Sequence, residues 1–175
     1  MRKLLFSPAF SFREAALLFV EALVIMLLWA QCITFVVELA NGAQVAKHSM
    51  YYYAPYSLFV PPIALQLVFE EAFRLVPLAS VVWIVGRFAR LRPYGDRIIG
   101  TASAVTAVAF GLMHLPNGLP LAIVLCCQTV LGFALNVIYL RTGGMHGRIV
   151  RAFWFAYAMH LSYDILLAVI EKTFT

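Results

Sequence analysis

The sequence predicts an all-α protein, namely a polytopic membrane helix bundle of about five transmembrane helices. Three observations lead to this fold class. The 175-residue chain is 63% hydrophobic and only 12% charged, whereas soluble domains contain about 45–50% apolar and about 25% charged residues. Its mean hydropathy is +0.90. The apolar residues form five runs, and a helix needs about 20 such residues to cross a bilayer.

The five runs define the expected helices. In the second run, Pro61 and Pro62 suit the first turn of a helix, and Pro77 is expected to kink it. This run is longer than one crossing requires, while each of the others has the length of a single span. In chain order, the predicted spans are 15–39, 60–88, 98–115, 119–140 and 149–170.

The positions of Lys and Arg predict how the bundle is oriented, because positive residues collect in cytoplasmic loops. The N-terminus and the loops after the second and fourth spans are basic. By contrast, the segment 41–57 has only Lys47 and the loop "LPNGLP" has no basic residue. The N-terminus is therefore expected to be cytoplasmic and the C-terminus to lie outside. The basic residues are Arg2, Lys3, Arg13, Arg87, Arg90, Arg92, Arg97, Arg141, Arg148 and Arg151.

Charge and cysteine content exclude several other classes of protein. The net charge of +5 is accounted for by the loops, so the expected partner is the lipid bilayer and not a nucleic acid. The cluster "MYYYAPY" at 50–56 fits an aromatic belt at the outer interface or a loop packed on the bundle. Cys32, Cys126 and Cys127 lie inside apolar runs without CxxC spacing, which indicates neither a disulfide framework nor a zinc knuckle.

Ionisable residues within these spans or at their ends cost roughly 2.5–3.5 kcal/mol each on insertion scales. Glu21, near the inner end of the first span, is one such case and is assigned no chemistry. Six others form a set. They come from three different spans and combine carboxylates, imidazoles and one guanidinium. A set of this kind handles protons or binds a metal ion, so these residues are the candidate site. They are Glu70, Glu71, Arg74, His114, His160 and Asp164.

The spacing of these residues also has a structural interpretation. Glu70 and Arg74 are four residues apart, as are His160 and Asp164, so each pair shares a helix face and could be an internal ion pair or hydrogen bond. A pair with Arg74 uses only one carboxylate, however. Glu71 then remains available as a general acid or base.

Three further polar residues have comparable alternatives. His114 could be a hydrogen-bond partner between two helices and not part of a catalytic site. Gln66, one turn before the Glu pair, and Asn136, in the fourth span, can line the same polar site or connect neighbouring helices. We favour the connecting role for Asn136.

Three motifs in order along the chain resemble the CPBP family of intramembrane proteases, which process CAAX proteins and bacteriocins and are also called the Abi family. The motifs are "EEAFR" at 70–74, "FGLMH" at 110–114 and "HLSYD" at 160–164, and the stretch "GFALNVIYLRTGGM" also resembles the family. The resemblance covers about 60–170. In the first motif, one residue fewer than in the family pattern separates the Glu pair from the Arg, so either Glu can take the catalytic position.

The resemblance implies a single domain in two parts. Residues 1–59 form an N-terminal segment with the first transmembrane helix and an outer loop, and residues 60–171 form a four-helix catalytic core. The implied activity is that of an intramembrane endopeptidase acting on a membrane-associated or exported protein, for example at a C-terminal sorting or anchor segment. The implied location is a bacterial cytoplasmic membrane, with the site facing outward under the topology above.

The resemblance also implies roles for the site residues. Glu70 or Glu71, with His114, would activate a water molecule, and His160 with Asp164 would polarise the scissile carbonyl. Arg74 would hold the catalytic carboxylate. No cofactor is required on this interpretation. Zinc would be the alternative, with Glu70 or Glu71, His114 and His160 as its ligands.

Two other functions are compatible with the same set of ionisable residues. An inactive member of the family could act as a bacteriocin-immunity or scaffold protein, which the shortened first motif allows. A proton-coupled carrier would also need ionisable groups in its spans, but five spans without an inverted repeat argue against it.

Overall fold

The computed structural model describes residues 10–41, 56–115 and 120–173, and no β-strand occurs among them. The expected all-α bundle of five long helices is confirmed. These helices are α1 (Phe12–Asn41), α3 (Tyr56–Arg87), α4 (Gly95–Leu112), α6 (Thr129–Thr142) and α7 (Ile149–Thr173). The short elements are η1 (Arg92–Tyr94), α5 (Leu121–Ile123), the π-helical turn η3 (Val124–Gln128) and η4 (Gly144–His146).

The second helix differs from its prediction at the N-terminal end. Helix α3 begins at Tyr56, so Pro61 and Pro62 lie inside it and do not start it. The helix continues through Pro77 without a break. The basic residues at 2 and 3, the aromatic cluster at 50–55 and the centre of the "LPNGLP" loop at 116–119 lie outside the described residues.

Within the described part of the chain, three stretches are long and apolar enough to cross a membrane by length and composition: Phe12–Ala40, Leu121–His146 and Ile149–Ile170. The other two long helices, α3 and α4, are more polar. Helix α3 contains the Glu70, Glu71 and Arg74 group, and α4 has only 18 residues and carries charged ones in its first turn. These two helices must therefore cover their polar groups against neighbouring helices in order to enter lipid.

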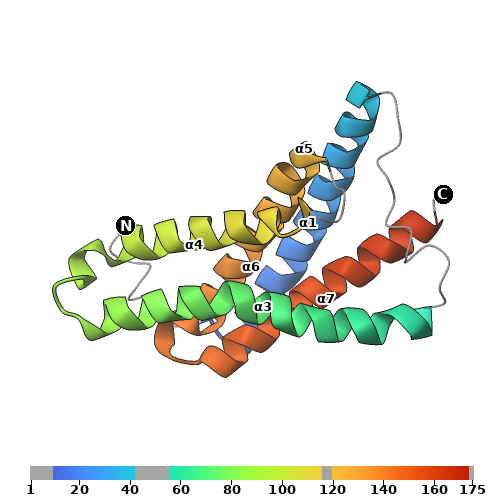
Figure 1. Ribbon diagram of the computed structural model, residues 1–175. Helices are drawn as coiled ribbons and strands as arrows, with labels where there is room; N and C mark the ends of the chain where they lie inside the picture. Colours follow the sequence, from blue (N-terminus) through green and yellow to red (C-terminus); the bar gives the residue numbers. More distant parts are fainter. Residues whose placement is uncertain (1–9, 42–55, 116–119, 174–175) are drawn as a thin grey trace.

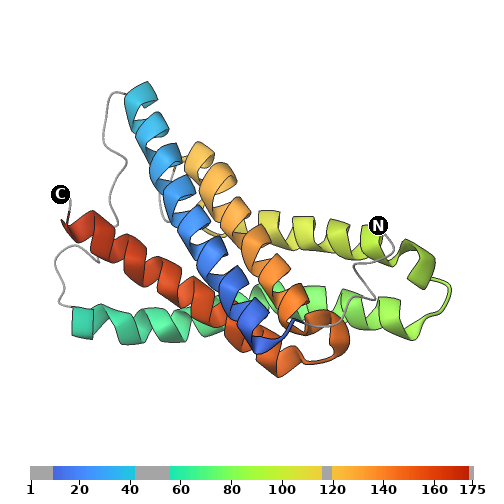
Figure 2. The same ribbon diagram turned by 180° about the vertical axis from the view of Figure 1, so that it is seen from behind.

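Figure 1 shows how the long helices lie against one another. Helices α3 and α4 are antiparallel neighbours, and α6 packs on both α4 and α7. Helix α7 in turn contacts α3. Helix α1 lies along α6 and also contacts α7, as the view from behind shows (Figure 2). Helix α1 is thus added to one side of the group formed by the other four.

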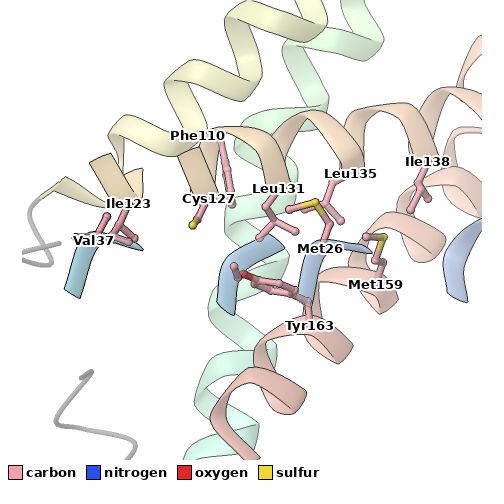
Figure 3. Close-up of a cluster of buried hydrophobic side chains, with 11 residues drawn as sticks. Met26, Val37, Phe110, Ile123, Cys127, Leu131, Leu135, Ile138, Met159 and Tyr163 are labelled. Atoms are coloured by element: carbon pink, nitrogen blue, oxygen red, sulfur yellow. The ribbon is translucent and has the colours of Figure 1, made fainter. Parts of the chain in front are cut away.

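A cluster of buried apolar side chains joins α1, α4, α6 and α7 (Figure 3). Leu131 and Leu135 of α6 lie next to Met26 of α1, and Met159 of α7 belongs to the same cluster. Phe110 of α4 belongs to the same cluster and is fully buried. The cluster therefore holds the C-terminal end of α4, which precedes His114, close to the middle of α7, which carries His160.

Close approach of α4 and α6 depends on two glycines. A Cβ atom on Gly132 would lie 2.8 Å from Cδ1 of Phe110 and 3.3 Å from Cα of Ala107. A Cβ atom on Gly111 would clash with Oγ1 of Thr129. Small residues at such contacts let the backbones of membrane helices approach closely. Any larger residue at Gly132 must displace the buried Phe110 ring.

Candidate active site

The structure brings the six predicted side chains together from three helices. Glu70, Glu71 and Arg74 come from the middle of α3, His114 follows the end of α4, and His160 and Asp164 come from α7. They divide into a buried group and a partly exposed group. The side chains of Glu71, Arg74 and His160 are at most 2% exposed, whereas those of Glu70, His114 and Asp164 are 12%, 14% and 31% exposed.

The buried group is a hydrogen-bonded chain centred on Glu71. Oε2 of Glu71 accepts a hydrogen bond from Nη2 of Arg74, three residues later on the same helix. Oε1 of Glu71 lies 2.9 Å from Nδ1 of His160. Since an ionised carboxylate can only accept, the proton in this bond is on Nδ1. Both oxygens of Glu71 are therefore occupied, and they fix the guanidinium on one side and the imidazole on the other.

The pairing within the first motif differs from one expected alternative. Four-residue spacing allowed Glu70 to pair with Arg74, but Arg74 pairs with Glu71. A three-residue separation also places two side chains on one helix face. The shortened spacing of "EEAFR" is therefore compatible with a paired and buried arginine.

Glu70 and His114 form the partly exposed group. Nε2 of Gln66 donates to Oε1 of Glu70 at 2.6 Å. Oε2 of Glu70 faces Nε2 of His114 at 3.9 Å, which is too long for a direct hydrogen bond. Nδ1 of His114 donates to the Phe110 carbonyl at 2.9 Å, so Nε2 of the neutral ring is an acceptor. Two acceptors at this separation can share one water molecule that donates a hydrogen bond to each.

Asp164 faces the other nitrogen of the buried histidine. Its Oδ2 lies 3.9 Å from Nε2 of His160. This side of the imidazole points away from Glu71 and toward the partly exposed carboxylate. His160 can therefore present Nε2 to a ligand while its Nδ1 is held by Glu71.

Phe110 separates the two imidazoles and supports both. Its ring centroid lies 4.9 Å from that of His114 and 5.4 Å from that of His160, with edge-to-face angles of 63° and 71°. The guanidinium carbon of Arg74 lies 5.8 Å from the same ring. Edge-to-face contacts of this kind contribute about 0.5–1.5 kcal/mol beyond burial. One buried ring thus orients three of the candidate side chains.

The sequence analysis missed the members of this network on α4, and it named Asn136 of α6 without its partners. Asn136 of α6 accepts from Nη1 of Arg74 through Oδ1, and its Nδ2 donates to the Ser103 carbonyl and to Oγ1 of Thr106. The Gly132 carbonyl also accepts from Nη1 of Arg74, at 3.3 Å. The only signal in the sequence was an amide side chain, Asn136, within an apolar run. It suggested a contact between helices but did not indicate that the partner is Arg74.

Metal binding depends on which donors are available at the site. Among the described residues, no three His, Cys, Asp or Glu side chains form a group that could hold a metal ion. The zinc set with Glu71 as a ligand does not fit this arrangement, because both oxygens of Glu71 are engaged with Arg74 and His160.

The two groups have different chemical capacities. Glu70 and His114 are proton acceptors that face each other across a gap, so they can bind and deprotonate a water molecule. His160, with a proton on Nε2 as well, can donate to a developing negative charge. Glu71 and Arg74 are engaged with each other and with buried neighbours. They can position other groups.

Comparison with known proteins gives one match. Residues 52–166, about two thirds of the chain, match the family model described as type II CAAX prenyl endopeptidase, Rce1-like. This confirms the resemblance to the CPBP family of CAAX proteases. No curated protein and no solved structure was found to be similar to the chain. The matched range includes all six candidate residues and leaves out the described part of α1.

Proposed function

This chain belongs to the Rce1-like family of type II CAAX prenyl endopeptidases, and from that premise we propose that it hydrolyses a peptide bond within the bilayer with Glu70 and His114 as the water-activating pair. The observation that carries this proposal is the difference between the two adjacent carboxylates. Glu71 is buried with both oxygens engaged, while Glu70 is partly exposed beside His114. Of the two, only Glu70 is available for proton transfer.

The proposed reaction assigns a step to each group. Water bound between Oε2 of Glu70 and Nε2 of His114 loses a proton to Glu70 as its oxygen attacks the scissile carbonyl carbon. The carbonyl oxygen becomes an oxyanion, which accepts a hydrogen bond from Nε2 of a doubly protonated His160, while Nδ1 of the same ring stays bonded to Glu71 and Asp164 lies beside Nε2. The C–N bond then breaks, and the proton held by Glu70 passes to the leaving amine. Placed donors of this type are worth about 10²–10³ in kcat.

We also propose a substrate for the enzyme, the membrane in which it lies and its orientation there. The substrate is a polypeptide held in the membrane and cut near its C-terminal anchor segment. The proposed location is a bacterial cytoplasmic membrane, as the family resemblance implies. The arginines in the loops support an N-terminus in the cytoplasm. The N-terminal half of α3, and with it Glu70, then opens toward the outer face.

The test uses purified protein in lipid vesicles with two internally quenched peptides. One peptide ends in a farnesylated CAAX sequence, and the other ends in an apolar C-terminal anchor segment without a prenyl group. We expect cleavage by the wild type and a loss of about 10²–10⁴-fold in Glu70→Gln. The matched control is Glu21→Gln, which changes an exposed carboxylate on α1. Full activity of Glu70→Gln would contradict the assignment of the base.

The two peptides also decide between substrate classes. Cleavage of the anchor peptide supports the proposed substrate, and cleavage of the farnesylated peptide alone replaces it with a prenylated one. An inactive family member would cleave neither peptide, and the Glu70→Gln substitution would leave its phenotype in cells unchanged.

A further inference from the structure

We propose that Asn136 is a positioning residue of this site, which acts through Arg74 and Glu71 to fix the proton-bearing nitrogen of His160. The inference rests on the proposed function, because it assigns His160 a role at the scissile carbonyl. It adds a residue outside the three motifs, on the helix α6 that carries none of the six candidate side chains. A continuous series of hydrogen bonds leads through this residue from α4 to α7.

The first step is the orientation of the Asn136 amide. Asn136 is 0% exposed, so its polar atoms depend on protein partners. Nδ2 donates to the Ser103 carbonyl at 2.9 Å and to Oγ1 of Thr106 at 3.0 Å. A carbonyl can only accept, so this face must be the NH₂ group. Oδ1 is therefore fixed on the opposite side, where it accepts from Arg74.

The second step is the orientation of the guanidinium. Arg74 is 1% exposed and donates through Nη2 to Glu71 and through Nη1 to Asn136. The remaining contact of Nη1 is the Gly132 carbonyl at 3.3 Å, and Nε has no hydrogen-bond partner in the described part of the chain. The rigid fork of donors is thus held at one end by Glu71 and at the other by Asn136. Without Asn136, Nη1 keeps one long contact, and the guanidinium is free to turn.

The third step leads from the guanidinium to the imidazole. If the guanidinium of Arg74 rotates, its Nη2 moves away from Oε2 of Glu71. The other oxygen of this carboxylate, Oε1, accepts from Nδ1 of His160 at 2.9 Å, so it moves as well. The hydrogen bond made by one ring nitrogen decides which nitrogen carries the proton. When that acceptor moves, the preference for a proton on Nδ1 is lost. The ring is then no longer held at Glu71, and the direction in which Nε2 can donate is lost.

Two variants on the same helix separate positioning from stability. Asn136→Leu removes the amide with little change in volume. The matched control is Thr142→Val, which removes a fully buried hydroxyl of α6 whose hydrogen bonds stay within its own helix. Asn136→Asp, which has the same shape, serves if the Leu variant does not fold. It keeps an oxygen beside Arg74 but places a second carboxylate on the guanidinium, in competition with Glu71.

The measurement is the ¹⁵N spectrum of histidine side chains in labelled protein in detergent micelles, which needs no substrate. His160 is assigned from the signals missing in His160→Gln, and His114 is an internal reference because its Nδ1 binds a backbone carbonyl. In wild type and Thr142→Val, at a pH where the His160 ring is neutral, we expect its one proton to be on Nδ1. In Asn136→Leu or Asn136→Asp we expect two His160 populations and an unchanged His114.

The kinetic result should follow the spectrum. The substrate is whichever of the two quenched peptides the wild type cleaves. We expect kcat of Asn136→Leu to fall by about 10–100-fold, the effect seen when a residue that orients a metal ligand is removed. KM should stay within about twofold, because Asn136 touches no substrate. A wild-type His160 spectrum in a folded Asn136 variant, or equal effects of the Asn136 and Thr142 variants, would overturn the proposal. If the wild type cleaves no peptide, the proposed function fails, but the spectrum still decides the role of Asn136.

Discussion

Substitution by Gln should affect the stability of the protein strongly at Glu71 and only weakly at Glu70. Glu71→Gln keeps the shape of the side chain but removes the counter-charge of Arg74, which is 1% exposed. Removing one partner of a buried ion pair costs about 3–5 kcal/mol, a large part of a total stability of about 5–15 kcal/mol. Glu70→Gln is different, because its side chain is partly exposed and an amide oxygen can still accept from Gln66. It should cost less than about 1 kcal/mol.

The assay is unfolding in mixed micelles of mild detergent and dodecyl sulfate, followed by circular dichroism, with peptide cleavage measured on the same preparations. We expect Glu71→Gln to unfold at a clearly lower fraction of dodecyl sulfate and Glu70→Gln to unfold with the wild type while losing cleavage. A Glu71→Gln protein within about 1 kcal/mol of wild type would refute the reasoning, and so would equal destabilisation by both substitutions.

Three other perturbations test separate parts of the structure. Gly132→Ala puts a Cβ atom 2.8 Å from Cδ1 of the buried Phe110 and should lower stability by about 1–3 kcal/mol, measured in the same micelles; an unchanged midpoint would mean that α4 and α6 are farther apart. Trp29→Phe removes the hydrogen bond from Nε1 to the Cys126 carbonyl at 2.6 Å, so it should cost about 1 kcal/mol and expose α1 to limited proteolysis without changing cleavage by the core. Asn117→Cys, in a cysteine-free background, should react with a membrane-impermeant maleimide added outside intact cells, and labelling only in inverted vesicles would reverse the orientation.

The helices themselves could be predicted from the sequence because their signal is local. Each predicted span overlaps a long helix, since apolar runs of spanning length leave no alternative in lipid. The predicted start of α3 is wrong, because Pro61 and Pro62 suit a first turn but lie inside a helix that begins at Tyr56. The π-helical turn at Val124–Gln128 was not predicted. The residues of this turn, VLCCQ, do not differ in character from the apolar helix around them, so the sequence contains no signal for it.

The candidate residues could be found from the sequence, but their connections could not. Polar side chains within apolar spans stand out in the sequence, because burying them in the bilayer is energetically costly and they are therefore rare there. Which glutamate binds Arg74 depends on the rotation of α3 against α6, where Asn136 holds the guanidinium from the far side. The position of Phe110 between two imidazoles likewise depends on contacts among three helices. Such long-range contacts leave no spacing rule in the chain.

The three-residue interval between Glu71 and Arg74 also bears on the biosynthesis of the protein. A chain entering the membrane helix by helix exposes each new segment before its later neighbours have been made, and unpaired charges at that stage are expensive. Opposite charges three residues apart can neutralise each other within a single nascent helix. The segment around α3 can therefore leave the ribosome and insert with those two charges already matched, and it meets the histidine of α7 only when the last helix arrives.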